Sequence, residues 1–182
     1  PHAWQPFALN LFSAVCGAGA LGLLARSVAL LPQDRTRDQR QREGGDHGLL
    51  SMPASWLPPI FAALVCGLQL SIWEHATSAT GEMLDLLLFS FAVWSLLEYR
   101  IDGRAARLYA LAFVYGMSVT NNWAMIGFFP GFLVALIWIQ GIRFLNWRFL
   151  ARMLLAGLLG LTLYFLLPLI EKSGNGADMT FW

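Results

Sequence analysis

Apolar residues are gathered into six long runs along the chain, and a polar stretch separates each run from the next. An apolar helix needs about 20 residues to cross a bilayer, with a range of about 17–25. The pattern therefore predicts an all-α polytopic membrane protein, a single transmembrane domain over 1–182 with about six transmembrane helices. The expected spans are 7–31, 55–73, 82–99, 106–121, 123–141 and 151–170. Because the fourth run is short, a re-entrant hairpin over 106–141 is the alternative.

Basic residues are concentrated in alternate loops of this pattern. The chain has eleven Arg and one Lys, and ten of the Arg fall in the connections 33–48, 99–107 and 142–152. In the intervening loops, Lys172 is the only Lys or Arg residue. Cytoplasmic loops carry an excess of Lys and Arg, so the arginine-rich loops are predicted to be cytoplasmic. The ten residues are Arg35, Arg37, Arg40, Arg42, Arg100, Arg104, Arg107, Arg143, Arg148 and Arg152.

Composition agrees with a membrane protein and narrows its partners. Hydrophobic residues make up 57% of the 182 positions and charged residues 13%, about half the charged fraction of a soluble domain. The net charge is +1, and no soluble basic face interleaved with aromatic residues is present, so no nucleic-acid partner is expected. Membrane lipids are the expected surroundings. Cys16 and Cys66 lie within apolar runs and are read as small hydrophobic residues.

Ionisable residues gather where the second and third runs meet. Glu74 and His75 end one run, and Glu82 and Asp85 begin the next, with Thr80 as the expected N-cap. Ionisable groups at membrane depth are costly and usually face a protein interior or a wet cavity. Glu82 and Asp85 are three residues apart and therefore share a helix face. The alternative is that both are ordinary first-turn acids, favoured by the helix dipole.

Two amides follow the fourth run at the same predicted outer end. Asn121 and Asn122 suit a tight turn between two short helices, or a role in lining a polar pocket, and both readings stay open. Pro130 is expected to kink the second of those helices. We expect Glu82, Asp85 and Asn122 to line one outward-facing, substrate-binding pocket together with Asn121, with His75 near its rim.

The acids also raise the question of a cofactor. Glu74, His75, Glu82 and Asp85 have the ligand types of a divalent metal site, but their spacing matches no established signature. A bound divalent metal is therefore a candidate cofactor, and no other cofactor is assigned.

Two glycine patterns are read as helix packing. The sequence Gly17-x-Gly19-x-x-Gly22 matches a dinucleotide fingerprint, but it lies inside a long apolar run rather than after a strand. Gly157 and Gly160 are likewise expected to let helices approach closely.

The polar islands resemble a known family. The run from Glu74 to Asp85, the stretch Leu97-Glu98-Tyr99-Arg100 and the run from Gly116 to Pro130 look like a bacterial family of uncharacterised multi-span proteins. That family is similar to the transmembrane protein O-mannosyltransferases of the GT-C class. The opening stretch from Phe7 to Ala14 resembles the family's second span, and Glu82 matches the acid that opens its third span. Leu84 stands where relatives often have an aromatic residue.

The resemblance implies a membrane-embedded glycosyltransferase in the bacterial inner membrane. Its donor would be a polyprenyl-phosphate-linked sugar used at the outer, periplasmic face, and its acceptor a protein or glycan, as in protein O-glycosylation. The family's catalytic acid lies in an outer loop before the segment that begins this chain. The catalytic residue is therefore unknown here and expected upstream of residue 1. This fragment would contribute part of the wall of the active site.

A different class of function fits the same residues. A membrane transporter or scaffold module could use Glu82 and Asp85 in an outward-facing acidic pocket without enzymatic activity. Proton relays, however, need ionisable groups through the depth of the membrane. The clustering of these acids at one end favours an outer-face site.

The charge asymmetry predicts which loops face the cytoplasm. In full-length protein stripped of its native cysteines, the substitution Arg40→Cys should react with a membrane-impermeant maleimide only after the membrane is opened. Strong labelling of intact cells would overturn this topology.

Overall fold

The computed structural model describes residues 4–31, 56–78, 80–141 and 146–165, and every regular element in these ranges is helical. This confirms the predicted all-α class. In chain order the elements are α1 (Trp4–Leu30), α3 (Leu57–Gly67), α4 (Leu70–Ala76), α5 (Glu82–Asp102), α6 (Ala105–Asn121), the 3₁₀ helix η2 (Trp123–Phe128), α7 (Phe129–Gln140), α8 (Trp147–Leu161) and the 3₁₀ helix η4 (Thr162–Phe165).

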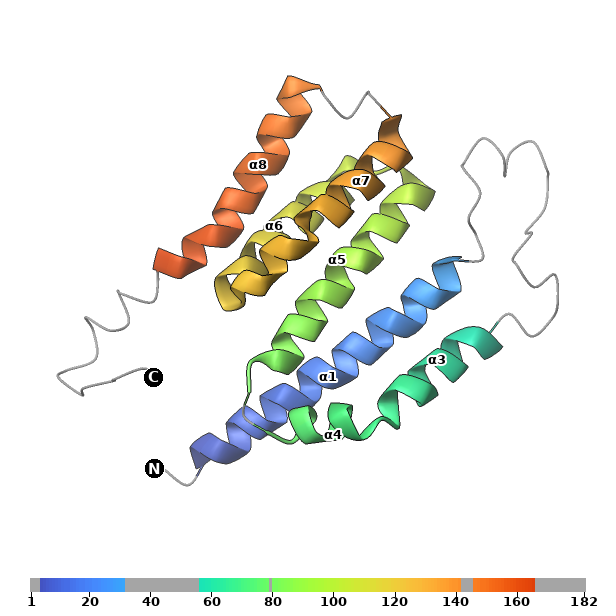
Figure 1. Cartoon of the computed structure of the whole chain (residues 1–182), viewed down its shortest axis with the longest axis vertical. Helices are drawn as coiled ribbons and strands as arrows, with labels where there is room; N and C mark the ends of the chain where they lie inside the picture. The colour runs from blue at the N-terminus through green and yellow to red at the C-terminus, as the bar shows by residue number, and fades with distance from the viewer. Residues whose placement is uncertain (1–3, 32–55, 79, 142–145, 166–182) are drawn as a thin grey trace.

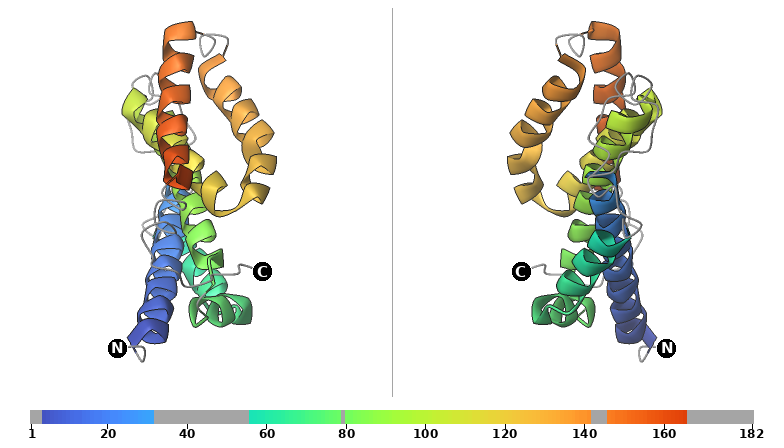
Figure 2. Two further views of the ribbon diagram at one scale, coloured as in Figure 1. Left: turned by 90° about the vertical axis from the view of Figure 1, so that its left-hand side faces the viewer. Right: turned by 90° about the vertical axis from the view of Figure 1, so that its right-hand side faces the viewer.

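The helices lie side by side, and successive long helices run in opposite directions, whereas α4 continues from α3 after a bend (Figure 1). Helix α1 packs against α3 on one side and α5 on the other, α5 packs against α6, and α6 packs against α8. Helix α7 diverges from α8 on one side of this row (Figure 2). The buried core lies between α5, α6 and α7 and contains Ala92, Leu96, Tyr99, Leu108, Leu111 and Leu136.

Three helical segments of the described ranges are long and apolar enough to cross a membrane: Pro6–Leu30, Trp123–Gln140 and Trp147–Tyr164. The bent pair α3 and α4 counts as a fourth if it forms one span. Helix α6 has only 17 residues. Helix α5 has 21 residues but includes Glu82, Asp85, Glu98, Arg100 and Asp102. The structure thus supports three to four spans, and the count of six stays a prediction.

The second predicted span, 55–73, is not one continuous helix. Helix α3 ends at Gly67, Gln69 has an extended backbone, and α4 leaves at an angle of 67°. Gly67 also lies against α1, where an added Cβ would be 3.3 Å from Leu21 Cδ1. Glycine weakens a helix, and the polar Gln69 interrupts the apolar run, so the break falls at the least favourable point of the segment.

The hairpin over 106–141 turns at the predicted residues. Helix α6 ends at Asn121, and Asn122 is extended with φ −145° and ψ 113°. The prediction that Pro130 kinks the second helix is wrong. Pro130 lies in the first turn of α7, after a 3₁₀ segment, at a position where its missing N–H removes no helical hydrogen bond. Helix α8 begins at Trp147, before the predicted 151, and residues 166–170 of that span lie outside the described residues.

Glycines bring helix backbones together, as predicted for Gly157 and Gly160. A Cβ added to Gly116 would collide with the carbonyl oxygen of Gly157, and one added to Gly160 would collide with that of Phe113. A Cβ added to Gly17 would lie 3.2 Å from Met83 Sδ of α5, and one added to Gly19 would lie 3.0 Å from Leu87 Cδ1, so both glycines also serve packing. The expected packing role of Gly22 is not found, because nothing lies within 4 Å of a Cβ there.

An ion-pair network that the sequence reading did not single out joins α1, α5 and α6 at the arginine-rich end. Arg26 of α1 donates from both Nε and a terminal nitrogen to Glu98 Oε1 of α5, at 3.3 and 3.1 Å. Arg107 of α6 lies 3.8 Å from the other oxygen of Glu98 and 3.5 Å from Asp102. Glu98 is only 9% exposed, so its charge depends on these partners.

The glycine contact predicts a packing defect on substitution. Gly116→Ala should separate α6 from α8 and lower stability by about 1–3 kcal/mol, the usual cost of overpacking. Gly22→Ala is the matched control, because nothing lies within 4 Å of a Cβ there. Thermal unfolding of the full-length protein in detergent measures both, and an equal effect of the two substitutions would contradict the packing role.

The ion-pair network predicts a stability loss for Glu98→Gln. The substitution keeps the size of the side chain but leaves Arg26 and Arg107 facing a neutral amide. Because the Arg26 side chain is 59% exposed and can be rehydrated, we expect about 1.5 kcal/mol, the lower end for hydrogen bonds to charged groups. Glu74→Gln is the control, since Glu74 is exposed. An unchanged melting temperature for Glu98→Gln would show that the network contributes nothing.

Candidate functional site

The polar cluster at the start of α5 is centred on Asp85. Its Oδ1 accepts a hydrogen bond of 2.6 Å from Asn121 Nδ2, and its Oδ2 accepts one of 2.8 Å from Asn122 Nδ2. Asn121 Nδ2 also reaches the carbonyl oxygen of Gly81 at 3.4 Å. The structure therefore brings Asp85, Asn121 and Asn122 together from two helices that are 36 residues apart in sequence.

The orientation of the Asn122 amide follows from its neighbours. Its Oδ1 accepts a hydrogen bond of 3.0 Å from the backbone N–H of Ala124, which makes it the N-cap of η2. A backbone N–H can only donate, so the oxygen must face Ala124 and the NH₂ group must face Asp85. The extended backbone of Asn122 ends α6 and aims the side chain at α5.

His75 and Glu82 form a second pair beside this carboxylate. His75 Nδ1 contacts Glu82 Oε2, which joins the end of α4 to the first turn of α5. Both side chains are partly exposed, at 41% and 59%. With Nδ1 on the carboxylate, the other ring nitrogen, Nε2, is left as the group that can meet a ligand.

The expected N-cap of α5 is wrong, and the four candidate metal ligands do not all lie together. Thr80 does not cap α5, because the N-cap is Gly81 and the carbonyl of Thr80 instead accepts a bond of 3.5 Å from Ser13 of α1. The four candidate metal ligands do not gather into one group in the described residues, and a bound metal stays a prediction. Across the described ranges no three His, Cys, Asp or Glu side chains converge where an ion could be held. Glu74 is exposed and does not join the pair of His75 and Glu82.

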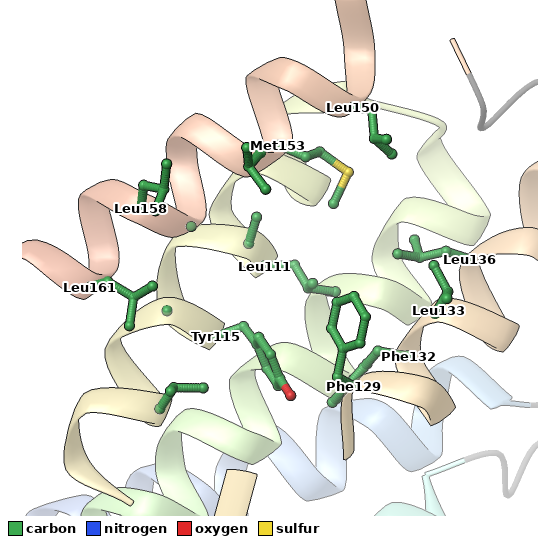
Figure 3. Close-up of a pocket in the computed structure, with 15 residues that line it drawn as sticks. Leu111, Tyr115, Phe129, Phe132, Leu133, Leu136, Leu150, Met153, Leu158 and Leu161 are labelled. Carbon is green, nitrogen blue, oxygen red and sulfur yellow. The ribbon is translucent and has the colours of Figure 1, made fainter. Parts of the chain in front are cut away.

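An apolar cavity of about 390 Å³ lies between α6, α7 and α8 (Figure 3). Leu111, Leu136 and Met153 are among its lining side chains, and Tyr115 is the one lining residue with a hydroxyl group. The Tyr115 ring packs against Phe132 with the ring centroids 5.5 Å apart. Its hydroxyl donates a bond of 2.6 Å to the carbonyl of Met125 in η2.

The sequence reading missed Tyr115 as a residue of this region. The available signal was a hydroxyl-bearing side chain within an apolar run, six residues before Asn121 on the same helix. The sequence did not indicate which of the four tyrosines would bind the 3₁₀ turn, because the acceptor on Met125 is a backbone carbonyl, which every residue has.

Comparison with known proteins identifies the family. Residues 3–143 match the family model described as the protein O-mannosyl-transferase TMEM260 N-terminal domain. The match takes in α1 to α7, including Asp85, His75 and the two asparagines, whereas α8 lies beyond it. No curated protein and no solved structure matches the chain. The chain therefore belongs to the family of the protein O-mannosyl-transferase TMEM260 N-terminal domain.

Proposed function

We propose that this chain is part of a membrane-embedded glycosyltransferase that uses a polyprenyl-phosphate-linked sugar at the outer face of the membrane. Family membership supports the transferase class. The observation that carries the site is the Asp85 carboxylate, held by two asparagine amides next to the pair of His75 and Glu82. The expected setting is the inner membrane of a bacterium, with this cluster on the periplasmic side.

Asp85 is suited to binding hydroxyl groups. A carboxylate offers about four acceptor positions, and Asn121 and Asn122 occupy two of them. The remaining positions can accept bonds from a sugar or from the hydroxyl of a protein or glycan acceptor. Because both amides fix the plane of the carboxylate, it can orient a bound hydroxyl without losing its own freedom at that moment.

His75 supplies the cationic character that a phosphate-linked donor needs at this end. Charge develops on the departing lipid phosphate during transfer and calls for a donor or a cation. When protonated, the imidazole of His75 is held by Glu82 through Nδ1, and its Nε2–H is left for a ligand. In this proposal Asp85, His75 and Glu82 bind and orient the substrates, and none of them is assigned the role of proton acceptor.

A lipid-linked donor also needs an apolar environment for its hydrocarbon chain. The cavity between α6, α7 and α8 provides one, and Tyr115 in its wall is about 9 Å along α6 from Asn121. A polar cluster and an apolar cavity on one helix thus fit a ligand with a polar head and an apolar chain.

A transporter or scaffold module is the second candidate. Helix α5 has acids at both ends, as a proton relay would need, but Glu98 and Asp102 are paired with arginines. Between Asp85 and Glu98, α5 contains no ionisable side chain that could continue a relay. This arrangement favours a site at one face.

The proposal is tested by sugar transfer in membranes containing the full-length protein. With polyprenyl-phosphate mannose as the donor, Glu82→Gln and Asp85→Ala should each lower transfer by at least about tenfold, ~1.4 kcal/mol in barrier. Glu74→Gln should keep wild-type activity, because Glu74 lies outside the cluster. Wild-type transfer rates in folded Glu82→Gln and Asp85→Ala proteins would overturn the site. Proton flux in vesicles that Asp85→Ala abolishes would favour the transporter.

A further inference from the structure

The short 3₁₀ helix η2 is attached to α5 at both of its ends. At its start, Asn122 donates to Asp85. At its end, Phe128 packs on Phe89 with ring centroids 4.9 Å apart. Asp85 and Phe89 are four residues apart on α5 and so lie on the same face of that helix. The turn therefore runs along one face of α5 and covers the side of Asp85 that faces Asn122.

The middle of η2 is attached to α6 instead. Tyr115 donates to the carbonyl of Met125, and Met125 is only 7% exposed. Short 3₁₀ helices have weak hydrogen-bond geometry and depend on such outside contacts to hold one conformation. The Tyr115 hydroxyl fixes the position of Met125 in η2. Asn122 fixes the start of η2 by capping the N–H of Ala124.

Both ends of the Asn122 side-chain amide are thus engaged within the protein. The oxygen holds Ala124 N–H and the nitrogen holds Asp85. The Tyr115 hydroxyl is engaged by the carbonyl of Met125, and the Tyr115 ring forms part of the cavity wall (Figure 3). These contacts are suited to holding Asp85 rather than to meeting a ligand.

We propose that Asn122 and the hydroxyl of Tyr115 are positioning groups that act through η2 to fix the carboxylate of Asp85, and that neither the Asn122 amide nor the Tyr115 hydroxyl contacts the substrate. The inference refines the expectation that Asn122 binds substrate directly. It rests on the proposed function for its catalytic consequence, because that function puts Asp85 beside the substrate. The position of the carboxylate itself can be measured without any substrate.

The first experiment measures the reactivity of Asp85 in the full-length protein. A water-soluble carbodiimide with glycine ethyl ester modifies accessible carboxylates, and mass spectrometry gives the extent at each residue. Asn122→Ser keeps a side-chain oxygen for the cap on Ala124 but is too short to reach Asp85. It should raise modification of Asp85 by about threefold or more, since a hydrogen bond to a charged group is lost. Tyr115→Phe should raise it less, in the same direction.

Internal and matched controls separate this effect from unfolding. Glu82 is the internal reference, because its contact with His75 involves neither substitution. Thr120→Val is the control variant, since among the described residues the Thr120 hydroxyl bonds to carbonyls of its own helix alone, those of Gly116 and Met117. Unchanged reactivity of Asp85 in Asn122→Ser would overturn the proposal. A rise in Asn122→Ser without one in Tyr115→Phe would overturn the role of Tyr115.

The second experiment measures transfer from polyprenyl-phosphate mannose. A positioning role expects kcat to fall in Asn122→Ser and Tyr115→Phe while KM for the donor changes little, whereas loss of a direct contact would raise KM. A raised KM with unchanged kcat in either variant would overturn the proposal. If the wild-type protein transfers no mannose, the proposed function fails, and the carbodiimide result still decides whether η2 positions Asp85.

Discussion

Helix α5 is held in place by polar contacts at its two ends, and the arrangement of the other helices depends on them. At one end Asp85 is bound by the amides that terminate α6, and at the other Glu98 is bound by arginines from α1 and α6. Between these ends α5 is apolar apart from two serines. Polar groups within an apolar surrounding must be satisfied by the protein itself, so each attachment also fixes the register of its neighbour. Helices α1, α5 and α6 consequently form one frame.

Helix α8 is attached to this frame in a different way. Its contact with α6 depends on glycines that let backbone approach backbone, and no side-chain hydrogen bond described here joins the two helices. Close approach of this kind gains from dispersion and does not need polar groups. Helices α6 and α8 meet at the glycines, while α7 diverges from α8 (Figure 2). The apolar cavity lies between these three helices (Figure 3). Polar contacts thus join α1, α5 and α6, whereas α6, α7 and α8 enclose an apolar cavity.

The sequence predicted helix ends and local contacts correctly where the type of a single residue determines them. Asn122 ends α6 because an asparagine can cap the turn that follows. Asp85 and Asn122 were expected to lie together, and the Asn122 amide donates a hydrogen bond to the Asp85 carboxylate. Thr80 was the obvious cap for α5, but Gly81 starts the helix and the Thr80 carbonyl serves Ser13 instead. That choice depends on α1, which lies 67 residues away in sequence. The pair of Arg26 and Glu98 was missed for the same reason, since 72 residues separate the partners.

The two ends of α5 also explain why acids on one helix need not share a role. Glu98 faces two guanidinium groups and is nearly buried, so its charge is neutralised by the protein and is unavailable to a ligand. Asp85 is held by neutral amides, which orient the carboxylate but leave its negative charge uncompensated. A charge that is oriented and not neutralised retains its attraction for hydroxyl donors and cations. Within the described part of α5, this difference in partners singles out the end bearing Asp85 as the end suited to ligand binding.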